Sequence, residues 1–326
     1  MVDTFSKYRF ASAKKFLAAL RPSDSRWLKK GWWHITWAFR GQRNANWGLL
    51  PSVWRDDIVQ HPHYKMYLDN EANRDVSSIE GQLRKLFIGS DRNGDELQTE
   101  HRDREWERRR ERILVNARRL YGHQKFEFGV VRQFTEMADQ LGLVIPGRPF
   151  SRTASVSVPL GPGFENEDQP FDPVVAIAQH HGMPTRLLDW STNPMVAAFM
   201  ATEGVTDKMR GDIAVWALNI RELARRDSDI RPFTIARSES AYLHAQDGLF
   251  TFIRGGNIDF VLSGIWPNHE QEAPKGALVQ LQLPISEVPE LRRLLHVEGV
   301  HLARLMPTHD NISQMLKANW ERGGFA

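Results

Sequence analysis

The stretch "QHHGMPTRLLDWSTNP", residues 179–194, contains two adjacent histidines, a glycine, two prolines, a Thr-Arg pair and an Asp-Trp pair. Glycine and proline, which are typical of turns, occur here next to histidine, arginine and aspartate, whose side chains can bind ligands or catalyse reactions. This mixture is typical of turns that position a functional site. "PVVAIAQHH" before it predicts a short helix. "PMVAAFMATEG" after it predicts another, with Pro194 in the first turn and Gly204 past the end. We interpret the stretch as part of a functional site.

The composition is that of a globular protein, with 326 residues, 41% hydrophobic and 25% charged. The net charge of +3 does not by itself indicate a nucleic acid or an anionic membrane as partner. The absence of cysteine excludes disulfides, thiolate metal sites and a cysteine nucleophile, and it fits a reducing cytoplasm. Neither a signal peptide nor a long apolar run is visible, so we expect a cytoplasmic protein without a membrane partner.

Periodicity and turn residues predict the elements around this stretch. "SAKKFLAALRP" is expected to form a helix opened by Ser12 and closed before Pro22, and "HITWAFRG" a strand that runs into a turn. "GDIAVWALNI" and "KGALVQLQLP" alternate as strands do. "SEVPELRRLLHVEG" and "DNISQMLKANWERGG" are expected to be helices. Helices around separated strands, without a βαβ rhythm, indicate the α+β class.

Residues from about 60 to 145 are long, charged and helical in pattern. "ERRRERILVNARRLYG" predicts a helix with Gly122 as its C-cap, and "RQFTEMADQLG" a second helix stopped by Gly142. A proline-rich stretch from 142 to 172 predicts a loop. We therefore expect one domain over residues 1–326, with a charged helical insertion at about 60–145.

Standard motifs are mostly absent from the sequence. "GPGFEN" lacks the third glycine of a dinucleotide loop, and there is no P-loop, HExxH or GxSxG pattern. His180 and His181 are neighbours whose side chains diverge on a regular element, so they are poorly placed to share a metal. We expect no metal site.

Eight arginines and five acidic residues lie between Glu100 and Arg119. Opposite charges three and four residues apart indicate a solvated helix with intrahelical pairs. However, Arg104, Arg108 and Arg112 fall on one stripe, which fits a phosphate-binding face. Both interpretations remain open.

Three separated pieces, residues 37–55, 178–201 and 245–252, together resemble the FRG domain family, named for the triplet Phe39-Arg40-Gly41. The family pattern continues with W-x-L-x-P-S, then Q-H-x-G-x-P-T-R-L-L-D-W-[ST]-x-N-P, then Q-x-G-x-F. All of these are present. A weaker echo is "HLARLMPTHDNI", residues 301–312.

FRG domains in turn resemble ADP-ribosyltransferases, which cleave NAD and move ADP-ribose onto an acceptor. The resemblance implies an ADP-ribosyltransferase-like split mixed sheet flanked by helices. Such enzymes have an early strand with Arg or His, a Ser-Thr-Ser strand leading into a V-A-x-x-F-A helix, and a later strand with the catalytic Glu. Here Arg40 matches the first, Asp189-Trp190-Ser191 the second, and residues 196–201 the helix.

The resemblance implies a site for NAD as substrate. Breaking the nicotinamide–ribose bond needs donors for the pyrophosphate, aromatic walls for nicotinamide and a polar group near the ribose. The residues expected to bind NAD are Arg40, Gly41, Gln42, His180, His181, Thr185, Arg186, Trp190, Ser191 and Phe250. The arginines would grip phosphate, the rings would stack, and a histidine would donate or move a proton.

Catalytic roles fall to Arg40, Asp189, Glu239 and Gln246 by the same resemblance. Six residues before Gly248, where transferases usually carry the catalytic Glu, this chain has Tyr242. Glu239 is the nearest carboxylate before that position and Asp247 the nearest after it. Gln246 matches the family's own glutamine.

Structural interpretations stand beside these functional ones. Arg40 and Asp189 could form a structural ion pair, Trp190 and Phe250 could belong to the core, and one of the paired histidines could be a buried hydrogen-bonding residue.

The function expected from the resemblance is NAD-dependent mono-ADP-ribosylation of a macromolecule, with nucleic acid slightly favoured over protein. The role would be that of a bacterial toxin or phage-defence effector, with a possible antitoxin partner. Arg104, Arg108 and Arg112 would then bind the acceptor. The alternatives are a non-catalytic module that binds a nucleotide or a partner, and a nucleic-acid-binding regulator.

Overall fold

The computed structural model describes residues 5–28, 31, 34, 36–88, 96–143, 173–235 and 247–321. Contacts divide the chain into two compact units. The sheet unit comprises Met1–Leu49, Leu188–Phe252 and His269–Ala326, and the helical unit comprises Leu50–Leu187 and Ile253–Asn268. The single domain expected from the sequence stays a prediction. No helix in the described ranges is both long and apolar enough to cross a bilayer.

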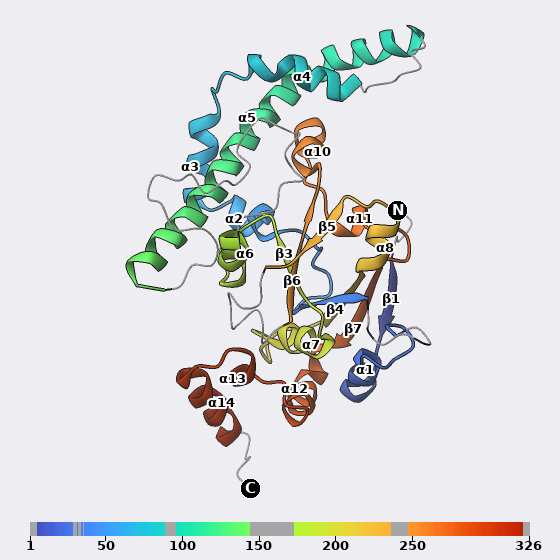
Figure 1. Cartoon of the computed structure of the whole chain (residues 1–326), viewed down its shortest axis with the longest axis vertical. Coiled ribbons are helices and arrows are strands. Elements are labelled where there is room, and N and C mark those ends of the chain that lie inside the picture. Colours follow the sequence, from blue (N-terminus) through green and yellow to red (C-terminus); the bar gives the residue numbers. More distant parts are fainter. Residues whose placement is uncertain are drawn as a thin grey trace. The chain divides into compact units, whose positions relative to one another are not determined.

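A seven-stranded open sheet forms the centre of the sheet unit, in the order β1-β7-β4-β2-β3-β6-β5 (Figure 1). Strand β1 runs parallel to β7, while the pairs β7–β4, β4–β2, β2–β3 and β3–β6 are antiparallel. The expected mixed sheet flanked by helices is confirmed. The strands are β1 Ser6–Arg9, β2 Trp37–Gln42, β3 Leu188–Ser191, β4 Asp212–Asn219, β5 Ile230–Phe233, β6 Gly248–Ile253 and β7 Leu278–Pro284.

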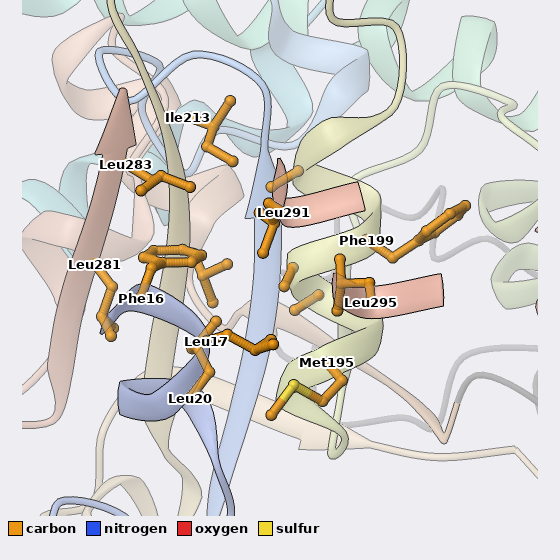
Figure 2. Close-up of a cluster of buried hydrophobic side chains, with 14 of the residues drawn as sticks. Phe16, Leu17, Leu20, Met195, Phe199, Ile213, Leu281, Leu283, Leu291 and Leu295 are labelled. Atoms are coloured by element: carbon orange, nitrogen blue, oxygen red, sulfur yellow. The ribbon is translucent and has the colours of Figure 1, made fainter. Parts of the chain in front are cut away.

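One face of this sheet is apolar and is covered by helices α1 (Ala13–Leu20), α7 (Pro194–Thr202) and α12 (Val288–Val297). Side chains of β4 and β7 meet those of the three helices in one buried cluster, seen in Figure 2. The sequence predicted these three helices, and their caps explain two of the starts. Ser12 accepts from the Lys15 amide at the start of α1, and Asn193 accepts from the Met195 amide at the start of α7.

Gly41 lets strand β2 approach helix α7 more closely than any other residue would. A Cβ atom at Gly41 would lie 2.0 Å from the carbonyl oxygen of Ala197 and 2.4 Å from the amide nitrogen of Ala201. We expected the strand to turn at this glycine, but β2 continues to Gln42. The glycine is therefore needed for packing rather than for a turn.

The opposite face of the sheet carries buried polar side chains that satisfy one another. Trp216 Nε1 donates to Gln42 Oε1 at 2.8 Å, and Gln42 Nε2 donates to the Gly48 carbonyl at 3.1 Å. Next to them, Gln280 Nε2 donates to the Ala45 carbonyl at 2.8 Å. These bonds fix the loop after β2 onto the sheet without leaving the buried amides unpaired.

The helical unit contains α3 (Pro62–Glu71), α4 (Ser77–Ile88), α5 (Glu96–Gln140), α6 (Pro173–His180) and α10 (Gly256–Ser263). Helix α5 runs unbroken through Gly122, so the prediction that Gly122 ends a helix is wrong. A Cβ atom there would lie 2.9 Å from the Cα of Leu68 on α3. The glycine admits α3 against α5, and the two helices predicted in this region are one.

Short elements complete both units. The sheet unit also has α8 (Ile220–Arg225), α11 (His269–Glu272), η3 (Ile285–Glu287), α13 (Leu302–Leu305) and α14 (His309–Glu321). The helical unit also has η1 (Ser52–Trp54) and α2 (Asp56–Val59). Of the predicted loop over 142–172, residues 144–172 lie outside the described residues.

The contact at Gly41 leads to a prediction about stability. Gly41→Ala should lower the free energy of unfolding by about 2–4 kcal/mol, because the new methyl group meets backbone atoms that cannot move aside. Urea denaturation followed by circular dichroism measures this. Gly81→Ala on α4 is the control, since no atom lies within 4 Å of its added Cβ. Equal stability of Gly41→Ala and the wild type would contradict the packing role.

Candidate functional site

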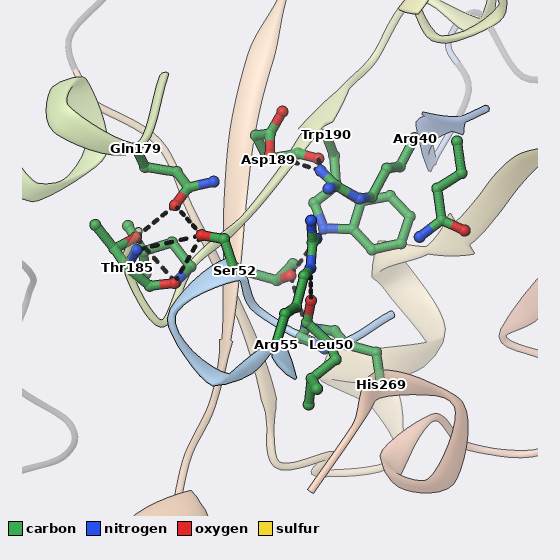
Figure 3. A network of polar contacts seen from close by, with 12 residues as sticks. Arg40, Leu50, Ser52, Arg55, Gln179, Thr185, Asp189, Trp190 and His269 are labelled. Atoms are coloured by element: carbon green, nitrogen blue, oxygen red, sulfur yellow. Dashed lines mark hydrogen bonds and ion pairs between the residues drawn. The ribbon is translucent and has the colours of Figure 1, made fainter. Parts of the chain in front are cut away.

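Arg40 lies where strands β2 and β3 separate. In the described chain these strands pair at one position, Phe39 with Ser191. Arg40 Nη1 donates to the backbone carbonyl of Asp189 at 2.7 Å and to its Oδ1 at 2.6 Å (Figure 3). The side chain of Arg40 is 13% exposed and that of Asp189 is 49% exposed. The arginine therefore joins β2 to β3 through its side chain, beyond the point where the backbones pair.

Not all donors of Arg40 are used in this contact. Both bonds to Asp189 come from Nη1. Within the described part of the chain, Nε is buried and has no hydrogen-bond partner. The Arg40–Asp189 ion pair considered from the sequence exists, and it uses one of the three guanidinium nitrogens. The binding of a pyrophosphate by Arg40 stays a prediction.

Trp190 is the first member of a buried chain of hydrogen bonds in the sheet unit. Its Nε1 donates to Thr251 Oγ1 at 2.8 Å, and that hydroxyl lies 2.8 Å from His269 Nε2. His269 is fully buried, and burial lowers its pKa from 6.5 to about 3, with Arg40 adding to the effect. The imidazole is therefore neutral. Its Nδ1 has no partner among the described residues.

The other predicted residues of the sheet unit have packing or capping roles. Ser191 Oγ accepts from the Asn193 amide at 2.9 Å. Phe250 is 1% exposed and stacks on Phe233, with ring centroids 5.6 Å apart. Trp190 is 4% exposed. The structure thus gives both rings a place in the core, and the stacking on nicotinamide expected for them stays a prediction.

The segment that was expected to carry the catalytic carboxylate ends beside strand β3. The Thr192 amide donates to the Asp247 carbonyl at 2.9 Å, which holds the start of β6 against the end of β3. Asp247 has a positive φ of 49°, which is uncommon for a residue other than glycine. Glu239 and Gln246 lie outside the described residues.

Within the helical unit, three motif residues form a cluster of their own. Thr185 Oγ1 donates to Gln179 Oε1 at 2.6 Å, and the Thr185 amide donates to Ser52 Oγ at 3.3 Å (Figure 3). Ser52 Oγ also lies 3.4 Å from Gln179 Oε1. The cluster ties W-x-L-x-P-S to Q-H-x-G-x-P-T-R, so Thr185 has a structural explanation without NAD. Gln179 and Ser52 stood in the quoted motifs, but we had not predicted them as site residues.

Arg186 is part of a buried ion pair in the helical unit. Its Nε donates to Glu127 Oε2 at 2.8 Å, its amide to Glu127 Oε1 at 2.8 Å, and its Nη1 to Asn257 Oδ1 at 3.3 Å. The exposed fractions of the two charged side chains are 10% and 1%. The guanidinium is committed to protein partners, so the structure does not support the pyrophosphate role expected for Arg186.

His180 and His181 end helix α6 and the turn after it. Their rings meet edge to face, with centroids 5.3 Å apart, and His181 stacks on Phe134 of α5 at 6.1 Å. Partial burial holds the pKa of His181 below its usual value. In the part of the chain that the structure describes, no group of three histidine or acidic side chains lies together as a metal site would need.

The arginine stripe of α5 lies on the solvent side of the helix. Arg104, Arg108 and Arg112 are exposed, whereas Trp106 and Ile113 are buried. Arg108 is 73% exposed and makes only a 3.5 Å ion pair with Glu105. The three arginines are therefore exposed on the helical unit, and the helix also carries the expected intrahelical ion pairs. A phosphate-binding role of the stripe stays a prediction.

Comparison with known proteins gives one match. The family model of the FRG domain matches residues 154–210. This range includes α6, β3, α7 and the quoted stretch from 179 to 194. No curated protein and no solved structure matches the chain.

The burial of His269 leads to a prediction about pH. The imidazole is neutral in the folded protein at pH 5, but it is protonated in the unfolded chain, whose histidines titrate near 6.5. The unfolded state then binds more protons, so stability falls as the pH drops below about 6.5. His269→Gln, which removes the titrating group, should lose less stability than the wild type between pH 7.5 and pH 5.

Urea midpoints at the two pH values measure this difference. His123 also has a pKa lowered to about 3 by burial, so part of the wild-type pH dependence should remain in the variant. An identical loss in the variant and the wild type would show that His269 is not held neutral.

Proposed function

Since the chain carries an FRG domain, we propose that it is an NAD-dependent mono-ADP-ribosyltransferase that modifies a macromolecule. One observation supports the proposal above all. The three strands that the resemblance matches to the arginine, the Ser-Thr-Ser and the catalytic-glutamate strands of transferases are β2, β3 and β6. They are consecutive neighbours in the sheet, although they are far apart in the sequence.

The junction between β2 and β3 adds to this support. The resemblance implied a split sheet. Strands β2 and β3 share one backbone pair, and beyond it the Arg40 side chain connects them by a hydrogen bond to the Asp189 carbonyl. Helix α7 follows β3 after a two-residue turn, as the helix after the Ser-Thr-Ser strand does in transferases. The unsatisfied Nε of Arg40 is a donor for which a phosphate oxygen is a suitable acceptor.

The proposed reaction replaces one bond to the ribose with another. A nucleophilic oxygen or nitrogen of the acceptor forms a bond to the anomeric carbon of the nicotinamide ribose as the bond to nicotinamide breaks. Nicotinamide leaves as a neutral molecule, and the acceptor loses a proton. The centre is cationic at the transition state, so a nearby carboxylate stabilises it.

Each residue of the site then has a role in the proposal. Arg40 binds the pyrophosphate, and Asp189 holds the guanidinium in position. The Asp189–Ser191 segment positions the nicotinamide riboside, while Gly41 and Gln42 hold β2 in place through their contacts with α7, Trp216 and Gly48. Glu239 or Gln246 faces the acceptor.

The surface of the helical unit supports one class of acceptor. Nucleic acid is slightly favoured over protein, because Arg104, Arg108 and Arg112 form an exposed stripe on α5. Such an activity suits a toxin or a phage-defence effector of the cytoplasm, which an antitoxin protein would hold inactive.

The test of the transferase proposal is label transfer from NAD. Purified chain is incubated with NAD labelled in the adenylate and with cell lysate, and nucleic acid and protein fractions are counted separately. Arg40→Ala should lower the incorporated label by about 100-fold or more, because it removes a charged contact to the pyrophosphate.

Arg9→Ala is the matched control for Arg40→Ala. Arg9 belongs to the same sheet and pairs with Asp212 at 2.7 Å, but it is exposed on β1. Its loss should leave the label unchanged. Folded wild-type protein that neither transfers label nor releases nicotinamide would overturn the proposal and favour a non-catalytic module that binds a nucleotide or a partner.

The exposed stripe on α5 supports a second candidate, a nucleic-acid-binding regulator. Arg108→Glu should weaken oligonucleotide binding. It should also reduce the slope of log affinity against log salt concentration by about 1, the value for one lost phosphate contact. Fluorescence anisotropy between about 50 and about 200 mM salt measures both effects.

Arg132→Glu is the matched control for Arg108→Glu. Arg132 is also an exposed arginine of α5, paired with Glu136 at 3.8 Å, but it lies outside the stripe. Equal effects of the two substitutions would show that only the overall charge matters, and that the stripe is not a binding face.

A further inference from the structure

The sheet unit has a cavity of about 600 Å³ at the start of helix α7. Four segments surround it: the end of α1, the turn before α7 with the first turn of that helix, Asp247 just before β6, and the loop that leads into α13. Its polar lining consists of Arg21, Ser23, Asn193, Asp247, Glu298 and Arg304. Its volume lies in the range of small-molecule sites. Arg21 lies outside the motifs, Arg304 lies only in their weaker echo at 301–312, and the proposed site uses neither arginine.

Both guanidinium groups keep donors for a ligand. Arg21 meets Glu298 at 3.4 Å, in an exposed ion pair of the kind that contributes little free energy. Arg304 Nη1 makes a 3.3 Å bond to the Gly299 carbonyl. Gly299 has a φ of +79°, and a Cβ atom there would lie 2.8 Å from Arg304 Nη1. The loop thus depends on glycine to hold Arg304 at the cavity.

The rest of the lining differs from a simple phosphate site. Asp247 and Asn193 offer acceptors for the amino and hydroxyl groups of a ligand. Met195, Val196 and Val300 add apolar surface. A nucleotide presents all three kinds of partner: an anionic phosphate, donating amino and hydroxyl groups, and a flat ring. An acidic peptide would use the arginines but would not need the adjoining carboxylate.

The place of the cavity in the fold connects it with the acceptor. Asp247 lines the cavity and directly follows residues 236–246, the segment that contains Glu239 and Gln246. In the proposed function, Glu239 or Gln246 faces the acceptor. A ligand in this cavity would therefore lie next to Asp247, at the start of β6.

We infer that this cavity binds one nucleotide of a single-stranded nucleic-acid acceptor, with Arg21 and Arg304 on its phosphates and Asp247 and Asn193 on its polar edges. Glu298 is the group that the phosphate displaces from Arg21. The inference rests on the proposed function for its link to catalysis, but the binding itself is testable without any reaction.

The first experiment measures binding with labelled single-stranded DNA and RNA of about 12 nucleotides, a length within the usual site sizes for such strands. Fluorescence anisotropy at fixed salt compares the full-length wild type with Arg21→Gln and Arg304→Gln. Each should weaken binding about tenfold or more, because a charge-assisted bond to phosphate is lost.

Two further variants separate this site from a general effect of charge. Arg293→Gln removes an exposed arginine of α12 that pairs with Glu290 at 2.8 Å and does not line the cavity, so binding should be unchanged. Glu298→Gln frees Arg21 and removes a negative charge, so binding should become tighter. If these residues had only a structural role, the arginine variants and Glu298→Gln would not change the oligonucleotide affinity in opposite directions.

The second experiment separates the inference from the proposed function. With NAD present, Arg21→Gln and Arg304→Gln should raise the KM for the oligonucleotide and leave nicotinamide release to water unchanged. A wild type that binds oligonucleotides through these arginines but never releases nicotinamide would sink the transferase proposal and keep the nucleotide site.

Two results would overturn the inference. One is transfer activity with unaltered oligonucleotide affinity in both arginine variants, each shown to be folded by its thermal transition. The other is label that enters the protein fraction alone, from a wild type that does not bind the oligonucleotides.

Discussion

The contact between Arg40 and Asp189 joins two strands of the sheet that share a single backbone pair. On one side lie β1, β7, β4 and β2, and on the other lie β3, β6 and β5, joined by a single backbone pair between Phe39 and Ser191. The Arg40 guanidinium supplies a further link by donating to the Asp189 carbonyl and carboxylate. A ligand that takes hold of Arg40 therefore acts on the joint between the two parts of the sheet. Arg40 thus has a structural role in the sheet.

The quoted stretch is long because it serves both units of the protein. The boundary between the units falls between Leu187 and Leu188. Before it, Gln179, Thr185 and Arg186 make hydrogen bonds inside the helical unit. After it, residues 188–194 form β3 and the cap of α7 in the sheet unit. The residues of this stretch thus have two separate sets of partners, one in each unit.

Sequence patterns predicted the elements that have a clear period or cap. Helices α1, α7 and α12 and strands β4 and β7 lie where alternation and capping residues indicated. Gly122 misled the prediction, because its use is a close approach of α3 that no local pattern reveals. The same limit applied to the site. Arg186 looked like a phosphate ligand, but its partner Glu127 lies 59 residues earlier in the chain and is buried. His269 gave no local signal, since its importance comes from Thr251 and Trp190, which only the fold brings to it.

Within the described chain, two buried groups near the junction of β2 and β3 lack a hydrogen-bond partner. Among the described residues, Arg40 Nε and His269 Nδ1 are both buried without a hydrogen-bond partner. A buried group left in this state costs about 1–3 kcal/mol. The rest of the polar layer is different, because Gln42, Trp216 and Gln280 are paired at ordinary distances. The sheet unit therefore satisfies these buried glutamines, whereas Arg40 and His269 retain unused hydrogen-bonding groups. An acceptor that reached Arg40 would recover that free energy, and it would do so at the junction of β2 and β3.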